Sequence, residues 1–309
     1  MYISEEQVRA ALNYESLIPV IRQALLDYSA GRVEQPARMI LRAGNAEGHR
    51  NGWFALMPVI HGDVMGVKTV TFYPGNAELG IHTHMAMIEL LDRATGEPLA
   101  VMDGRLVTEM RTAAVSAVAF EALAPLHFES RPKSFGIIGS GVQARAHVQA
   151  LRHVWPEMNE ILIWSPTRAH AEKCAEELGG RAVPIEHAAA ADVVLTATLS
   201  STPVLRGGSL QPNALVLAVG GIGATQRELD DDVMHTSWLV AESRDCVARE
   251  AGDVVSSGAT IQAEIGEILA NPEASAVPKA GRVLFKTVGM AIEDLVAARL
   301  VLGKAVHTS

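Results

Sequence analysis

Residues 134–144 read SFGIIGSGVQA, a short apolar run that leads into a helical pattern through small residues. Gly139 permits a tight turn, and Gly141 lets a pyrophosphate approach the backbone. Ala144 allows the following helix to pack closely on a sheet. The free N–H groups and the positive dipole end at the start of that helix favour phosphate. The stretch therefore predicts a strand, a dinucleotide-binding turn and a helix.

The middle third of the chain repeats this alternation of apolar runs and helical patterns. Runs such as ADVVLTAT and ALVLAVGG are nearly continuous in Val, Leu and Ala, which is typical of parallel strands buried on both faces. Right-handed crossovers would wind such strands into a doubly wound Rossmann sheet, so the fold class is α/β. The candidate strands are 134–139, 161–165, 181–185, 192–198, 214–220 and 238–242.

The flanking segments predict a second, α+β domain. A helical pattern capped by Ser4 continues to Gly31, and residues 36–103 are rich in strand patterns and turn residues. An alanine-rich helix follows over 108–123, and residues 285–303 read as a turn and an amphipathic helix. Since no low-complexity linker is present, we expect a rigid helix at the domain boundary near residue 112.

Composition limits the function classes. The chain has 309 residues and a formal net charge of −9, which argues against nucleic-acid and anionic-membrane partners, because both require a basic surface. Cys174 and Cys246 are isolated, so we expect buried or inert thiols. The N-terminus lacks the pattern of a signal peptide, and no apolar run is long enough to span a bilayer. A cytoplasmic enzyme is the expectation.

The residues after the second strand bear on the choice of dinucleotide. A carboxylate that binds the adenosine ribose is expected there in an NAD enzyme, but the sequence continues Ser165-Pro166-Thr167-Arg168. Two hydroxyls and a guanidinium suit a 2′-phosphate, because Arg offers a bidentate fork. We therefore predict NADPH, with NADH as the alternative. The competing interpretation is that Thr167 caps the next helix and Arg168 is solvated.

Several segments, in order along almost the whole chain, resemble the ornithine cyclodeaminase/mu-crystallin family. The resemblance implies a substrate-binding and dimerisation domain over 1–111 and 290–309, and an NAD(P)-binding Rossmann domain over 112–289. It also implies a homodimer that pairs the sheets of the first domain. The matching segments are QPAR (35–38), GVKTVTFYPGN (66–76), MDGRLVTEMRTAAVSAVA (102–119), GSGVQARAH (139–147), RELDDDVM (227–234), EAGDVVSSGA (250–259) and FKTVGMAIEDLVAARL (285–300).

The resemblance also implies site residues. Arg38, Lys68 and Arg111 match the basic residues that hold an amino-acid carboxylate, with Lys68 and Arg111 catalytic, and Val288 matches a further substrate contact. Lys68 shares a strand face with apolar residues, so its ammonium should seek an anion. Arg111 is expected in a helix first turn, where the dipole disfavours a cation and an anionic ligand would compensate. Structural ion pairing and snorkelling are the alternatives for Arg38 and Lys68. The matched cofactor contacts are Thr83, Thr112, Val142, Gln143, Thr198, Val219, Gly220 and Thr287, beside Gly139, Gly141, Ser165, Thr167 and Arg168.

Two features refine the function that the resemblance implies. Ornithine cyclodeaminases carry a catalytic aspartate where this chain has Ile222, and isoleucine cannot exchange protons. The chain looks closer to the branch that reduces cyclic ketimines, 1-pyrroline-2-carboxylate and 1-piperideine-2-carboxylate, to L-proline and L-pipecolate. His82 and His84 lack a third ligand, so we predict no metal. The alternatives are an alanine-type amino acid dehydrogenase, an ornithine cyclodeaminase that releases ammonia, and a cofactor-binding protein without activity.

Overall fold

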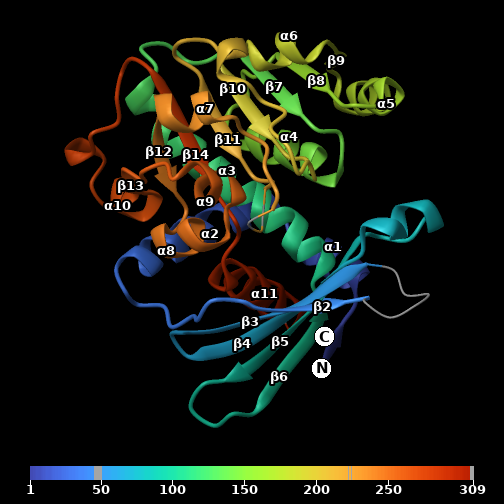
Figure 1. The fold of residues 1–309 in the computed structure, drawn as a ribbon. Coiled ribbons are helices and arrows are strands. Elements are labelled where there is room, and N and C mark those ends of the chain that lie inside the picture. The colour runs from blue at the N-terminus through green and yellow to red at the C-terminus, as the bar shows by residue number, and fades with distance from the viewer. Residues whose placement is uncertain (45–50, 222, 224, 307–309) are drawn as a thin grey trace. The chain divides into compact units, whose positions relative to one another are not determined.

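A computed structural model describes residues 1–44, 51–221, 223 and 225–306 of the chain. The chain forms two compact units, Met1–Arg111 with Met290–Ser309, and Thr112–Gly289. Each unit is built on its own β-sheet (Figure 1).

The first unit contains a six-stranded sheet in the order β1-β6-β5-β4-β3-β2. Neighbouring strands from β2 to β6 pair antiparallel, and β1 joins β6 in parallel. The strand-rich prediction for 36–103 is therefore confirmed. The strands are β1 (Tyr2–Ile3), β2 (Met39–Ala43), β3 (Gly52–His61), β4 (Val64–Phe72), β5 (His84–Asp92) and β6 (Pro98–Asp103).

Helix α11 (Ala291–Val306) covers one face of this sheet, where it packs against β3, β4, β5 and α2 (Tyr14–Ser29). Alternation along β4 sends Val64, Lys68 and Val70 to this inner face, and all three are buried. The apolar members of the face supply the core of the unit, because burial of their side chains is the main driving force for folding.

The opposite face of the same sheet is apolar and exposed. Met39 is paired with Leu56 across β2 and β3, and Thr69 with Met87 across β4 and β5, so these side chains share the outer face. Met39 is 58% exposed and Met87 is 51% exposed. Leu41 and Met85 on the same strands are also exposed. Exposed apolar side chains grouped on one face are a feature of interaction surfaces.

The helical segments of the first unit differ from the prediction in two places. The pattern expected to run from Ser4 to Gly31 forms two helices, α1 (Glu5–Ala11) and α2. The break occurs because Leu12 is extended and the Asn13 side chain accepts a hydrogen bond from the Ser16 N–H, which starts a new helix. Ser4 caps α1 as expected, and the Gln7 side chain completes a capping box with it.

Helix α3 (Arg105–His127) starts earlier than the predicted residue 108. The carboxylate of Asp103 accepts a hydrogen bond from the Arg105 N–H at 2.9 Å, which satisfies a free donor at the helix start. Arg111 consequently lies in the second turn of the helix, and the first-turn dipole argument for its anionic partner was wrong. Its partners are charged side chains instead, as the site shows.

The second unit contains an eight-stranded parallel sheet in the order β13-β12-β14-β11-β10-β7-β8-β9. The order reverses between β7 and β10, which is the switch point where doubly wound sheets bind ligands. The predicted Rossmann class is therefore confirmed. The strands are β7 (Ser134–Ile138), β8 (Glu160–Trp164), β9 (Arg181–Ala182), β10 (Val193–Thr196), β11 (Leu215–Ala218), β12 (Ser237–Ala241), β13 (Ala263–Glu264) and β14 (Arg282–Lys286).

Strand β14 was missed in the sequence, where its second half was interpreted as a turn. It lies between β11 and β12, and Val283, Leu284 and Phe285 are fully buried. The run is short and ends at Lys286, a charge that a buried central strand normally avoids. Asp253 makes that lysine tolerable, because its carboxylate lies 3.2 Å from the ammonium.

The remaining helices of the second unit connect its strands (Figure 1). Cys174 and Cys246 are buried free thiols, as predicted. Across the described ranges, no helix has both the length and the apolar character that crossing a membrane requires. The helices are α4 (Val142–Val154), α5 (Arg168–Leu178), α6 (Ile185–Ala189), α7 (Asp231–Thr236), α8 (Arg244–Glu250), α9 (Gly252–Ser257) and α10 (Ile265–Ala270), with 3-10 turns at Gly207–Ser209 and Pro272–Ala274 and, in the first unit, at Pro74–Leu79.

Candidate active site

Four charged side chains form a buried cluster in the first unit. Lys68 Nζ lies 2.6 Å from Asp294 Oδ2, and Arg111 Nε donates to Asp294 Oδ1 at 3.0 Å. Arg111 Nη1 donates to Glu293 Oε2 at 2.6 Å. None of the four side chains is more than 6% exposed. Charges buried this deeply require partners, so the network is a specific feature of the fold.

Three elements supply the cluster, and local rules explain each contribution. The two-residue period of β4 places Lys68 on the inner face. Glu293 and Asp294 lie in the first turn of α11, where the helix dipole favours acidic side chains. Arg111 projects from the second turn of α3. The expectation that Lys68 would seek an anion is met by a carboxylate of the chain itself.

Arg38 and His84 extend the charge field of this cluster. Arg38 is half-buried immediately before β2, and its positive charge acts on both Lys68 and Asp294. His84 shares the inner face of the sheet, and burial together with the charges of Lys68 and Arg111 lowers its pKa to about 3. At neutral pH it is an uncharged imidazole. The three cations predicted to bind a carboxylate, Arg38, Lys68 and Arg111, thus lie close enough for the charges of Arg38 and Arg111 to act on Lys68.

Burial sets the protonation of the cluster. It lowers the pKa of Lys68 to about 8, while Asp294 acts in the opposite direction. Burial also acts to raise the pKa of Asp294, but the charges of Arg111 and Lys68 outweigh it and hold that pKa below its usual range. At neutral pH Lys68 is therefore an ammonium close to its point of proton release, which suits a proton donor.

The four charges of this cluster balance, because Lys68 and Arg111 are positive and Glu293 and Asp294 are negative. Arg38 adds a positive charge that acts on the same groups. A ligand carboxylate would be attracted by these cations, and a low-dielectric environment makes that attraction stronger than in water.

The glycine-rich turn of the second unit has the geometry of a dinucleotide site. Gly139 adopts φ +127°, and a Cβ there would lie 2.5 Å from the carbonyl oxygen of Ala197, so glycine is required. Gly141 is the N-cap of α4 at φ −81°, and a Cβ there would meet nothing within 4 Å. This open space at a helix N-terminus fits a phosphate group.

The first turn of α4 offers further contacts to a ligand. No side chain caps the helix, so its first N–H groups are not satisfied by a cap. Val142 is 52% exposed beside the turn. The buried Oε1 of Gln143 has no hydrogen-bond partner among the residues that the structure describes. An unpartnered buried amide oxygen beside an open helix start fits a bound dinucleotide.

The predicted selectivity residues lie next to this turn. Ile138 and Trp164 are paired at the ends of β7 and β8, and the hydroxyls of Ser140 and Ser165 are 2.9 Å apart. Thr167 occupies the N-cap position of α5, but its hydroxyl makes no capping hydrogen bond.

Arg168 bears on the same question. Its side chain is 78% exposed and pairs with Glu172 at 2.7 Å, as in the solvated alternative. Arg168 thus reaches solvent while it pairs within its own helix, and the Thr167 hydroxyl makes no capping bond.

The other predicted cofactor residues of the second unit follow the carboxyl ends of its strands. Thr198 comes after β10, and its N–H donates to Glu228 Oε1 at 2.5 Å. The carbonyl oxygen of Gly220, after β11, accepts a hydrogen bond from Lys286. The hydroxyl of Thr287 donates to Glu242. Val219 follows β11 and is buried, and Val288 is buried with its N–H 3.2 Å from Glu242 Oε2.

Two residues lie outside these groups. Thr112 is a buried residue of α3, and Thr83 is half-buried immediately before β5. Ile222, which stands where ornithine cyclodeaminases have aspartate, lies outside the described residues.

Sequence reasoning missed the acidic partners in both units. Glu293 and Asp294 were not named as site residues, and neither were Glu228, Glu242 and Asp253, all of them buried. Acidic residues inside otherwise apolar segments are a detectable signal, because such residues are almost never buried unless paired. Each of them except Glu242 falls in a segment that carried the family resemblance.

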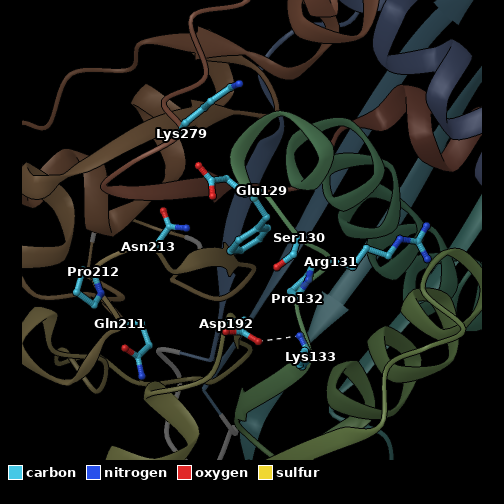
Figure 2. A pocket seen from close by; sticks show the side chains of 11 residues that line it. Glu129, Ser130, Arg131, Pro132, Lys133, Asp192, Gln211, Pro212, Asn213 and Lys279 are labelled. Atoms are coloured by element: carbon cyan, nitrogen blue, oxygen red, sulfur yellow. Dashed lines mark hydrogen bonds between the residues drawn. The ribbon is translucent and has the colours of Figure 1, made fainter.

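A pocket of about 570 Å³ occurs elsewhere on the second unit (Figure 2). Its lining includes Lys133 and Asp192, and the Lys133 N–H donates to Asp192 Oδ2 at 2.7 Å. These residues precede β7 and β10, so the pocket lies at the amino edge of the sheet. The glycine-rich turn lies at the opposite, carboxyl edge, and none of the predicted site residues lines the pocket.

Comparisons with known proteins show which family and folds the chain is similar to. The profile of the ornithine cyclodeaminase/mu-crystallin family matches residues 1–309. The chain is 38% identical to the ketimine reductase mu-crystallin of Mus musculus, over 97% of this chain and 96% of that protein. It is 32% identical to a Delta(1)-pyrroline-2-carboxylate reductase of Burkholderia ambifaria, over 95% and 92% of the two chains.

A solved structure is also similar over the full length. The Delta(1)-pyrroline-2-carboxylate reductase of Thermococcus litoralis, in complex with NADH and L-proline, matches with a TM-score of 0.91 and 32% identity. The match covers 100% of this chain and 98% of the other. The whole-chain profile, the two identities and this fold show that the protein belongs to the ornithine cyclodeaminase/mu-crystallin family.

Proposed function

We propose that this protein reduces cyclic ketimines, 1-pyrroline-2-carboxylate and 1-piperideine-2-carboxylate, to L-proline and L-pipecolate with NADPH. It is an oxidoreductase that acts on C–N bonds. The observation that carries the proposal is the buried cluster of Lys68, Arg111 and Asp294, on which the positive charge of Arg38 also acts. The similarity to a ketimine reductase and to pyrroline-2-carboxylate reductases supports the same substrate class.

In the proposed mechanism, Arg38 and Arg111 bind the substrate carboxylate and so fix the orientation of the ring. Lys68 also attracts the carboxylate, and its ammonium donates the proton that the ring nitrogen gains. A bound nicotinamide supplies the hydride for the C=N carbon. Val288 contacts the substrate ring. Positioning contributes about 7–11 kcal/mol to such reactions, and general-acid assistance adds roughly 10²–10⁴-fold.

The preference for NADPH rests on the residues after β8. Ser165, Thr167 and Arg168 offer hydroxyls and a guanidinium, and no acidic residue follows Trp164 directly. A 2′-phosphate gains charge-assisted hydrogen bonds from such a set, whereas NADH gains none there. The proposed cofactor contacts of the second unit are Thr112, Gly139, Gly141, Val142, Gln143, Thr198, Val219, Gly220 and Thr287, with Thr83 of the first unit near the nicotinamide.

We also propose a homodimer that buries the outer face of the first unit's sheet. Met39, Leu41, Met85 and Met87 expose apolar side chains on that face, and a second copy would remove them from water.

A cytoplasmic location and a role in proline metabolism complete the proposal. Fractionation of cells with an antibody to the protein tests the location.

The test of the reaction uses the purified protein, NADPH and the cyclic imine in the absence of ammonia. We expect cofactor oxidation with both ring sizes and formation of proline or pipecolate. Oxidation with pyruvate that depends strictly on ammonia would instead identify an amino acid dehydrogenase. Ammonia release from ornithine with NAD would identify a cyclodeaminase, and no turnover with any of them would indicate a binding protein.

A further inference from the structure

Asp294 contacts two buried cations, Lys68 and Arg111, yet the proposed reaction requires no acid at this position. One carboxylate oxygen faces Lys68 at 2.6 Å and the other faces Arg111 at 3.0 Å. We propose that Asp294 is a positioning residue that keeps Lys68 protonated and aimed, so that the lysine can act as the proton donor. This inference rests on the proposed function and assigns a further residue to it.

The position of the Lys68 ammonium is set by its contact with Asp294 on helix α11. Asp294 lies in the first turn of α11, so its backbone is held by a long helix that packs on β3, β4 and β5. Its two oxygens are divided between two cations, which leaves the carboxylate little rotational freedom. A lysine tail has four rotatable bonds, and this contact defines where its charged end lies.

Two other cations near Lys68 oppose its charge. Arg111 from α3 and Arg38 from the segment before β2 are both positive, and both lower the pKa of Lys68. His84 from β5 is neutral at pH 7 because burial lowers its pKa. Glu293 from α11 bonds to Arg111. Asp294 is thus the carboxylate that contacts the ammonium and compensates for its burial.

Removal of the Asp294 charge should therefore release the proton from Lys68. An opposite charge within about 4–6 Å shifts a pKa by roughly 1–3 pH units. The pKa of Lys68 is about 8 with Asp294 in place. Without the carboxylate it should fall to neutral pH or below, so Lys68 would become an uncharged amine under assay conditions.

Glu293 supplies a matched control, because it is the preceding residue of the same helix turn and is equally buried. Glu293→Gln removes the same charge as Asp294→Asn but breaks a contact to Arg111 rather than to Lys68. We expect the Gln variant to raise KM through Arg111. Its effect on the protonation of Lys68 should be much smaller than that of Asp294→Asn.

Two measurements test the proposal. The first is the pH profile of kcat/KM with the cyclic imine, in which the alkaline limb reports loss of the donor proton. The second is the pH dependence of the ¹³C chemical shift of the Lys68 Cε, assigned by comparison with Lys68→Met, which needs no activity. In Asp294→Asn both midpoints should move down by about 1–3 pH units, and Asp294→Glu should restore them. In Glu293→Gln both should stay near those of the parent.

Parent-like midpoints in Asp294→Asn, or equal shifts in both amide variants, would overturn the proposal. If the parent protein reduces no cyclic imine, the NMR midpoints of Lys68 still decide the role of Asp294, and only the proposed function fails. If Asp294→Asn does not fold, the charge-balanced Arg111→Gln/Asp294→Asn variant is compared with Arg111→Gln alone. A lower Lys68 midpoint in the double variant supports the proposal, and equal midpoints contradict it.

Discussion

Gly141 and Gly139 belong to the same turn, but the structure assigns them different roles. A Cβ at Gly141 would meet nothing within 4 Å, and its φ of −81° is open to any residue. Gly141→Ala should therefore leave the fold intact and even stabilise it by about 0.4–1 kcal/mol, because alanine restricts the unfolded chain. The new methyl group would instead occupy the space where a pyrophosphate approaches.

The expected loss of affinity follows from the contacts that this methyl group blocks. Hydrogen bonds to a charged group contribute about 1.5–3 kcal/mol each. Loss of one or two such contacts from the start of α4 amounts to about 3 kcal/mol, which corresponds to a roughly 100-fold increase in the Kd of the dinucleotide.

Gly139→Ala is the structural counterpart. Its φ is +127°, and the Cβ would lie 2.5 Å from the Ala197 carbonyl oxygen. Backbone strain alone costs about 1–3 kcal/mol, so this variant should be destabilised by at least about 2 kcal/mol.

Urea unfolding measures the stability of both variants, and quenching of protein fluorescence by NADPH measures the Kd. Gly208→Ala is the control, since a Cβ there also meets open space and the residue lies away from the turn. The reasoning would be refuted by parent-like NADPH affinity in Gly141→Ala, or by destabilisation of that variant comparable to Gly139→Ala.

Three further predictions follow from other parts of the structure. Arg168→Ala should increase the Kd of NADPH by roughly 10- to 100-fold, which is equivalent to the loss of one charge-assisted contact, and should leave the Kd of NADH unchanged. Equal effects on the two cofactors would contradict the selectivity role of Arg168, as would an equal effect of Glu172→Ala. Met87→Glu should dissociate the proposed dimer, measured by sedimentation, because a carboxylate would be buried in the apolar interface; an unchanged dimer would place the interface elsewhere. Burial lowers the pKa of His147 from 6.5 to about 4. Between these two pH values the unfolded chain binds a proton that the folded protein does not, so the free energy of unfolding falls as the pH drops from the higher value to the lower. His147→Gln should reduce the stability difference between pH 7 and pH 4.5, measured in urea, by about 2.5 kcal/mol, and an unchanged difference would contradict the assignment.

The features that sequence reasoning recovered depend on local chemistry. The turn at 139–144 was predicted because glycine spacing and the following helical pattern are read within a few residues. The inward direction of Lys68 was predicted because strand side chains alternate with a period of two. In both cases the relevant information lies within one element and its neighbours.

The features that it missed depend on contacts between distant segments. Alternation places Lys68 on a face but does not say that Asp294, from the far end of the chain, lies opposite it. Strand β14 was missed because its second half, from Phe285, was interpreted as a turn, and Asp253, which pairs with Lys286, is remote in sequence. Helix α3 starts earlier than predicted because the Asp103 carboxylate accepts a hydrogen bond from the Arg105 N–H at the start of the helix. Pairing of buried charges is a tertiary property that periodicity does not encode.

The central claim is that a cyclic imino acid receives hydride at its C=N carbon while its carboxylate is held by Arg38, Lys68 and Arg111. The most direct measurement incubates the protein with 1-pyrroline-2-carboxylate and NADPH deuterated at carbon four of the nicotinamide, and analyses the product by mass spectrometry and NMR. We expect L-proline with a single deuterium on the α-carbon. Absence of proline, or proline without deuterium at that carbon from either face of the labelled cofactor, would contradict the account.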